Sequence, residues 1–207
     1  VRLKIEINQG ERARIKDIVF IGDKKIKDKK LLEVIASEEH KFWKFVSKKV
    51  YLNESLINLD KRLLKNYYLN QGYYEVEILN SFAELNDKQS FKLVFNINAG
   101  KKYYFNDLSL TLPADYDKND FSKIDKIFKK LKNKRYSLDR INLILEEIDK
   151  VASLKLYDFI DANVSEEIGK DIMEFPKIQQ RIITQDLKQE IRKKININDN
   201  LNVKTNI

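Results

Sequence analysis

Few side chains in this 207-residue chain could carry out catalysis, because the residue types that enzymes use are scarce or isolated. There is no cysteine, which removes thiolate nucleophiles, thiolate metal ligands and disulfides. The only histidine, His40, stands beside Glu38 and Glu39 without a second histidine. It therefore completes neither a catalytic triad nor a set of metal ligands, and we expect it to be a surface residue.

Paired carboxylates and glycine-rich loops, two further signs of a reaction site, also lack a suitable arrangement. The acidic pairs are sequence neighbours, and in a pair such as Glu146-Glu147 on a helix the two carboxylates point in different directions. A glycosidase needs two carboxylates that converge across a cleft. The five glycines are isolated from one another, so none belongs to a loop that could hold a phosphate. The sequence predicts no catalytic residue, no metal site and no cofactor.

The net charge of +8 is the remaining chemical feature, because a basic surface attracts nucleic acid, acidic partners or anionic lipid headgroups. Lysines gather in two segments, Lys24–Lys30 and Lys123–Arg135, but acids dilute both of them. The second segment also has the spacing of the solvated face of an amphipathic helix. We favour a solvated surface as the explanation, and a site for lipid headgroups or for nucleic acid stays open.

The composition fits a folded chain that does not cross a membrane as a helix. Hydrophobic residues make up 43% of the chain and charged residues 35%, which is unlike a polar disordered segment. The longest uninterrupted apolar run is Ile18–Ile21, far shorter than the ~20 residues of a membrane-spanning helix. At ~150 residues per domain, the length predicts between one and two domains, and two small ones fit best.

The chain contains a repeat with an offset of 90 residues, seen when residues 1–10 are aligned with residues 91–100. Apolar residues occupy the odd positions of both segments, which predicts a strand with one buried face. Another strand pattern follows the closing glycine in both copies. The identical pairs are Leu3 and Leu93, Ile7 and Ile97, Asn8 and Asn98, and Gly10 and Gly100.

The first repeat reads as strand, helix, helix, strand, strand. Asn53 can cap the second helix, and Gly72 can end it in the left-handed conformation. Asp28 can accept hydrogen bonds from the first amides of the first helix. The expected segments are a strand at Ile15–Ile21, a helix that begins at Asp28, a helix after Asn53, a strand at Tyr74–Phe82 and a closing strand at Phe91–Ala99.

The second repeat follows the same order but departs from it near its end. A strand at Tyr103–Leu112, two helices and a strand at Phe159–Ile168 are predicted. No glycine recurs at the end of its second helix, where Tyr157-Asp158 stands instead. Beyond Pro176, the spacing of Ile178 and Ile182 predicts a helix, followed by a frayed Asn-rich end.

These features together resemble POTRA (polypeptide-transport-associated) domains, above all the periplasmic array of BamA-type outer-membrane assembly factors. The segments that carry the resemblance are the Phe20-Ile-Gly22-Asp-Lys turn, the Tyr67-Tyr-Leu-Asn-Gln-Gly72-Tyr segment and the aromatic insertion Lys41-Phe-Trp-Lys-Phe45. The resemblance implies an α+β fold of tandem POTRA repeats, each a three-stranded mixed sheet with two helices on one face. The implied domains are the last strand of a preceding repeat at 1–10, a complete repeat at 11–100, a partial repeat at 101–168 and a divergent tail at 169–207.

The resemblance also implies a function without catalysis. Such a module lies on the periplasmic side of the outer membrane of a Gram-negative bacterium and forms part of a larger protein. Its expected partners are unfolded outer-membrane proteins, accessory lipoproteins of the assembly complex and periplasmic chaperones. The alternatives are a POTRA module of a related secretion pore and a basic nucleic-acid-binding α+β protein.

The resemblance implies that the strand at Tyr74–Phe82 lies on a sheet edge, where its backbone could pair with an extended segment of a partner. The alternative is that charges such as Glu75 and Glu77 simply protect this edge. The residues of this predicted site are Tyr74, Glu75, Val76, Glu77, Ile78, Asn80 and Phe82. The aromatic residues Phe42, Trp43 and Phe45 either pack under their loop or form a patch that contacts a partner or the membrane surface. Gly10 and Gly100 are the predicted hinges between repeats.

Overall fold

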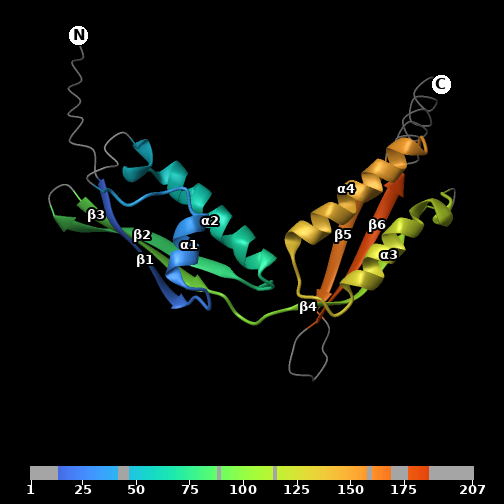
Figure 1. The fold of residues 1–207 in the computed structure, drawn as a ribbon, viewed down its shortest axis with the longest axis horizontal. Coiled ribbons are helices and arrows are strands. Elements are labelled where there is room, and N and C mark those ends of the chain that lie inside the picture. The colour runs from blue at the N-terminus through green and yellow to red at the C-terminus, as the bar shows by residue number, and fades with distance from the viewer. Residues whose placement is uncertain are drawn as a thin grey trace, which may run out of the picture. The chain divides into compact units, whose positions relative to one another are not determined.

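The computed structural model describes residues 14–41, 47–87, 90–113, 116–157, 160–168 and 177–186. The chain divides into two compact units, one before and one after Gly100, with Asn70–Gly72 grouped with the second unit. Each unit has its own sheet and its own pair of α-helices (Figure 1). Among the described residues, no helix has the length and apolar character that crossing a membrane would require.

The first unit has the predicted order of strand, helix, helix, strand, strand. Its central strand pairs with one neighbour in parallel and with the other in antiparallel, which gives the sheet order β1-β3-β2. The elements are β1 (Arg14–Asp23), α1 (Asp28–Val34), the short 3-10 helix η1 (Lys48–Val50), α2 (Glu54–Asn70), β2 (Glu77–Asp87) and β3 (Ser90–Asn98).

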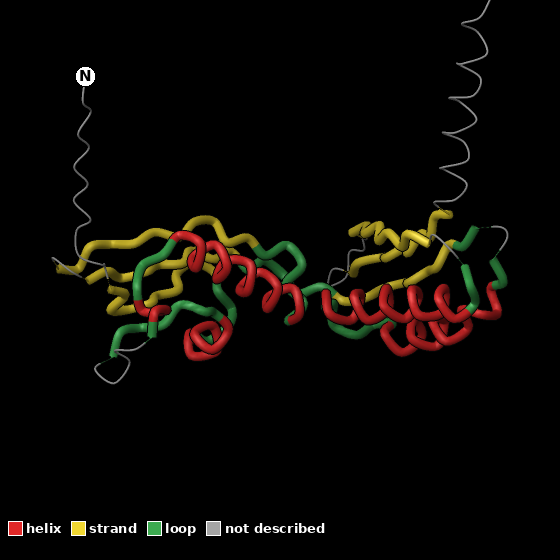
Figure 2. The backbone as a smooth tube through the Cα atoms, turned by 90° about the horizontal axis from the view of Figure 1, so that it is seen from above, coloured by secondary structure: helices red, strands yellow, loops and turns green. Residues whose placement is uncertain are grey.

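The core of the first unit lies between one face of the sheet and the two α-helices. Alternate residues of β3 point into it, as the period of two predicts, whereas a register shift after Ile15 places Ile15, Ile18 and Phe20 of β1 in the core. Phe20 stacks on Phe95 with ring centroids 5.7 Å apart. Figure 2 shows both helices on the same side of the strands. The main core residues are Ile15, Ile18, Phe20, Leu93, Phe95 and Ile97 of the sheet and Leu31, Leu64 and Tyr68 of the helices.

The ends of α2 follow the predictions, whereas the start of α1 does not. Asn53 Oδ1 accepts a hydrogen bond from the Leu56 amide at 3.0 Å, which caps α2. Gly72 has a φ of +92° and ends this helix in the left-handed conformation. The side chain of Asp28 makes no cap; its carboxylate pairs with the Lys24 ammonium, and Lys27 occupies the N-cap position.

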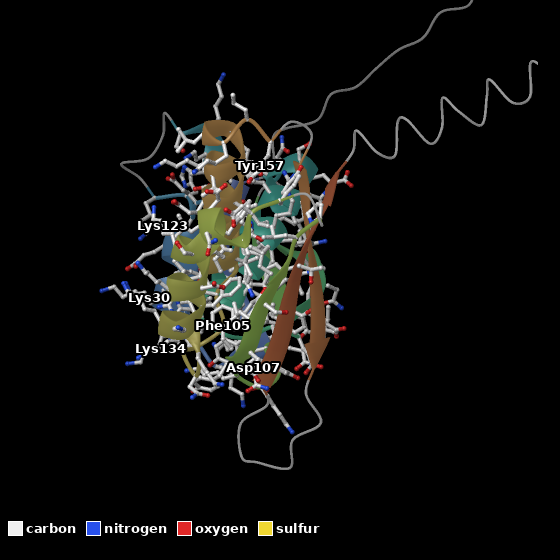
Figure 3. All side chains as sticks on the ribbon, turned by 90° about the vertical axis from the view of Figure 1, so that its right-hand side faces the viewer. Lys30, Phe105, Asp107, Lys123, Lys134 and Tyr157 are labelled. Carbon is white, nitrogen blue, oxygen red and sulfur yellow. The ribbon has the colours of Figure 1, made fainter. Side chains whose placement is uncertain are left out.

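The second unit has the same topology as the first. Its sheet order is β4-β6-β5, with β4 parallel and β5 antiparallel to the central strand. Phe105 of β4 is fully buried between sheet and helices, where it contacts Tyr136 (Figure 3). The elements are β4 (Tyr104–Thr111), the short 3-10 helix η2 (Lys118–Phe121), α3 (Ser122–Leu131), α4 (Leu138–Leu154), β5 (Ile160–Ile168) and β6 (Lys177–Asp186).

Strand β6 shows that the prediction of a helix beyond Pro176 was wrong. Ile178 pairs with positions in both β4 and β5, and so does Ile182. A spacing of four residues places two side chains on one face of a helix, but also on one face of a strand, because four is even. The two flanking strands decide between these possibilities, so the second unit continues beyond the boundary expected at residue 168.

The end of α4 explains how the second unit manages without the missing glycine. Leu156 takes the left-handed conformation itself, with a φ of +57°. The Tyr157 amide donates to the Ala152 carbonyl at 2.9 Å, as the Tyr73 amide donates to the Tyr68 carbonyl at 3.0 Å in the first unit. Both helices therefore end in the same type of turn, and Leu156 occupies the position that Gly72 has in the first unit.

Candidate functional site

Strand β2 lies on an edge of the first sheet, as predicted, because β3 occupies the centre. The predicted bounds of the strand need correction. Tyr74 and Glu75 belong to the turn before β2, and Val76 is buried with 3% exposure just ahead of it. The other four predicted residues, Glu77, Ile78, Asn80 and Phe82, belong to the strand.

The opposite edge of this sheet, along β1, is covered by the connection between α1 and α2. The His40 amide donates to the Ile15 carbonyl at 2.7 Å, and the Ile18 amide donates to Glu39 Oε1 at 3.2 Å. Tyr51 forms an antiparallel bridge with Arg14 at the start of the strand. Backbone groups of β1 at Arg14, Ile15 and Ile18 thus have partners within the same unit, so the first half of this edge is covered.

The outer edge of β2 has no such cover among the described residues, since the backbone hydrogen bonds of this strand all go to β3. Natural edge strands are commonly protected by lysine, proline or a covering segment. Strand β2 contains neither lysine nor proline. The first sheet therefore has one covered edge and one open edge.

Two irregularities limit the part of β2 that could pair with another strand. The register shifts between Ile78 and Asn80 and again between Leu85 and Asp87. A bulge disturbs the ladder and increases the local twist. The regular stretch between the shifts, Asn80–Leu85, has a length of about 20 Å at ~3.4 Å per residue. Every second residue of such a stretch directs its amide and carbonyl outward.

A comparison with known protein families agrees with this topology. The family model for POTRA, described as "Surface antigen variable number repeat", matches residues 13–100. These residues form a POTRA domain. The second unit has the same order and pairing of strands, so it repeats the POTRA fold.

Two curated relatives are similar over most of this chain. It is 26% identical over 170 residues to "Outer membrane protein assembly factor BamA" of Buchnera aphidicola subsp. Acyrthosiphon pisum, with 79% of this chain and 26% of the relative covered. The Neisseria meningitidis serogroup B protein of the same name is 23% identical over 165 residues, with 79% of this chain and 20% of the relative covered. The chain thus spans about a quarter or less of the length of these relatives.

Solved POTRA structures share the fold. The crystal structure of Haemophilus influenzae BamA POTRA3-5 matches with a TM-score of 0.66 and 16% identity, and the match covers 88% of this chain and 70% of that chain. The structure of BamA from Haemophilus ducreyi lacking POTRA domains 1-3 matches with a TM-score of 0.55 and 12% identity, over 84% of this chain and 30% of that chain. At such identities the likeness concerns the fold.

The open edge of the first POTRA repeat carries apolar side chains that the predicted site did not include. Leu79 is 55% exposed and Leu85 is 61% exposed, and they lie at the two register shifts. Phe82, 47% exposed, lies on the sheet face opposite the helices, next to Val94, which is 3% exposed on that face. Of these three residues the predicted site included Phe82; it missed Leu79, which lies at a register shift, and Leu85, because β2 continues beyond the predicted end at Phe82.

The lysine-rich segments are partly neutralised by acids of the same repeat. Lys30 pairs with Glu33 at 2.7 Å, and Lys132 pairs with Asp107 at 2.7 Å. Lys123, which pairs with Glu147 on the next helix, lies on the outer side of the helix layer (Figure 3). These contacts fit the solvated surface that we favoured from the sequence.

Several predicted features stay predictions. Gly10 and the aromatic residues Phe42, Trp43 and Phe45 lie outside the described residues. Gly100 has a φ of +68°, which favours glycine, but its role as a hinge is untested. Within the described part of the chain, no three His, Cys, Asp or Glu side chains are grouped so that they could hold a metal ion.

Proposed function

We propose that this chain is a periplasmic module of the outer-membrane protein assembly machinery and has no catalytic role. It binds extended segments of unfolded outer-membrane proteins, or of accessory subunits, along β2 and passes them on for insertion. The observation that carries the proposal is the difference between the two edges of the first sheet: among the described residues, the connection between the helices covers the first half of β1, and nothing covers β2. The curated relatives named as outer-membrane assembly factors support the setting.

Pairing through the backbone suits a module that must accept many sequences, because the hydrogen-bond ladder uses main-chain groups that every client has. The regular stretch Asn80–Leu85 offers about six outward amides and carbonyls. At ~1 kcal/mol net for each hydrogen bond, the ladder gives ~6 kcal/mol. This value falls within the ~4–15 kcal/mol that association costs, so a paired client is held weakly and can leave.

The proposal is tested by nuclear magnetic resonance titration of the 207-residue chain with capped ten-residue peptides of alternating Thr and Val. We expect the largest shifts in the amides of Asn80–Leu85. Two further peptides carry N-methyl groups, one at the odd residues only and one at every residue. An added strand can turn either of its edges to β2, so the first peptide should keep binding through its free edge and the second should lose it.

Binding through side chains alone would tolerate both methylated peptides, because the methyl groups leave the side chains in place. Retained binding of the fully methylated peptide, or shifts that avoid β2 altogether, would therefore contradict strand pairing. A change that is largest at β1 would show that the connection between the helices does not protect that edge.

A further inference from the structure

A groove lies beside the start of β2, between this strand and α2. Its helix side is formed by Lys61, Arg62 and Lys65. Its strand side is formed by the four residues Val76–Leu79. The volume of about 520 Å³ is within the ~300–1,000 Å³ that ligand sites commonly have. The groove could therefore receive several atoms of a side chain as well as backbone.

The three cations of the groove have no ionic partner among the described residues. Lys61 and Lys65 are four residues apart and so occupy one face of α2. Asp60, the acid nearest to them in sequence, is fully buried, and its Oδ1 accepts from two amides of the connection after α1. Among the described residues Glu77 is the one acid that lines the groove, so their net charge at the groove is positive.

The groove adjoins the stretch of β2 that is open to pairing. Its strand side ends at Leu79, and the regular stretch begins at the next residue, Asn80. A strand that pairs with β2 and continues past the register shift would therefore run into the groove. Side chains of a passing internal segment, rather than only a chain terminus, can reach the cations there.

We propose that the groove selects client segments that carry an acidic side chain next to the part paired with β2. The inference rests on the proposed pairing at β2 and adds a chemical preference to it. The apolar side chains of Val76 and Ile78 would contact the apolar residues of the segment, while the cations of α2 attract its carboxylate.

The test compares capped ten-residue peptides of alternating Thr and Val that differ only in one residue near an end, Glu or Gln. Each end is tested in its own pair of peptides, because either strand direction can pair with an edge. An exposed ion pair changes binding by up to about fivefold, so the Glu peptide should bind about two- to fivefold tighter than its Gln counterpart in low salt. The preference should shrink at 0.3 M salt, where charges are screened.

Variants of exposed residues assign the preference to the groove. The double variant Lys61→Gln, Lys65→Gln should remove the preference and leave the affinity for the Gln peptide within about twofold. The matched control Lys27→Gln, Lys29→Gln removes the same charge from the exposed surface of α1 and should keep the preference. Glu77→Gln should strengthen binding of the Glu peptide.

The outcomes separate this inference from the proposed function. Equal binding of the Glu and Gln peptides at β2 overturns the inference and leaves strand pairing intact, whereas absence of all binding overturns both. Loss of the preference in the Lys27→Gln, Lys29→Gln control would show that the overall positive charge attracts the Glu peptide. This result would overturn the role of the groove. The inference is also overturned if vesicles containing phosphatidylglycerol bind through Lys61 and Lys65 while the Glu and Gln peptides bind equally well.

Discussion

Replacement of Asp60 tests whether the connection between α1 and α2 is held in place by a single buried carboxylate. Asp60 Oδ1 accepts from the Ala36 amide at 2.6 Å and from the Ser37 amide at 3.1 Å. The same connection carries the residues that cover the β1 edge, Glu39 and His40. Asp60→Ala should therefore destabilise the first POTRA repeat and loosen the cover of β1 together.

The magnitude follows from the two amides that lose their acceptor. Each buried polar group without a partner costs ~1–3 kcal/mol, so two amides cost ~2–6 kcal/mol. Removal of the carboxylate offsets part of this cost, because Asp60 Oδ2 is itself buried without a hydrogen-bond partner. We expect a net loss of ~2–3 kcal/mol in the free energy of unfolding of the first repeat.

Asp60→Asn is the matched control, since its amide oxygen can still accept from both backbone amides. We expect the free energy of unfolding of Asp60→Asn to be higher than that of Asp60→Ala by at least ~1.5 kcal/mol, which is the net contribution of two hydrogen bonds. Urea unfolding gives the stability, and hydrogen exchange of β3 and β6 amides assigns the change to the first or the second repeat. Exchange of the Ile18 amide reports the β1 cover.

The reasoning fails if the Ala and Asn variants have the same stability, because the two hydrogen bonds would then contribute nothing. It also fails if Asp60→Ala leaves exchange at Ile18 unchanged while it destabilises the repeat, because the buried carboxylate would then support α2 without holding the cover of β1.

Three further predictions concern helix ends and turns. Leu156→Gly should stabilise the second repeat by ~0.5–1 kcal/mol in thermal unfolding, because a left-handed conformation costs a non-glycine residue ~1–2 kcal/mol and glycine returns part of that as entropy. Gly22→Ala should destabilise the first repeat by more than ~2 kcal/mol, since φ is +85° and the new Cβ would meet a β3 carbonyl oxygen; wild-type stability would show that the turn adapts freely. Hydrogen bonds from Lys155 and, as the smaller contribution, from Tyr157 hold the pKa of Asp120 below its usual value. Tyr157→Phe should therefore raise the pKa of Asp120, which a carbon-detected titration measures. At pH values above the pKa of Asp120 in the unfolded chain, the interactions of this carboxylate stabilise the second repeat. The stabilisation is lost as the pH falls through the lowered pKa of the native state.

The two edge strands of the first sheet, β1 and β2, differ in what covers their outer sides. Both strands flank β3, and the apolar residues that each contains do not show which of the two edges is covered. The difference arises from a connection that lies farther along the chain and returns to β1, with Ile18 and Glu39 separated by 21 positions in sequence. The proposed pairing role of β2 therefore rests on tertiary contacts more than on the residues of β2.

Local sequence signals predicted those features that nearby residues decide. The cap from Asn53 to Leu56 spans three residues, and the left-handed stop at Gly72 needs only the absence of a side chain. The alternation in β3 likewise predicted which residues would enter the core. In each case, residues only a few positions apart in the chain decide between the competing conformations.

Features that depend on distant partners were predicted poorly or missed. Ile178 and Ile182 suit a helix as well as a strand, and pairing with β4 and β5 decides between them. Leu156 adopts the left-handed conformation without any glycine signal, because α4 must end there before β5 begins.

The sequence by itself determined the order of elements, the repeat and the family resemblance, because periodicity and turn residues act over short distances. Only the tertiary structure decided which edge is open, where the bulges interrupt β2 and which cations lack partners. These properties depend on contacts between segments far apart in the chain, and such contacts leave no periodic trace in either segment.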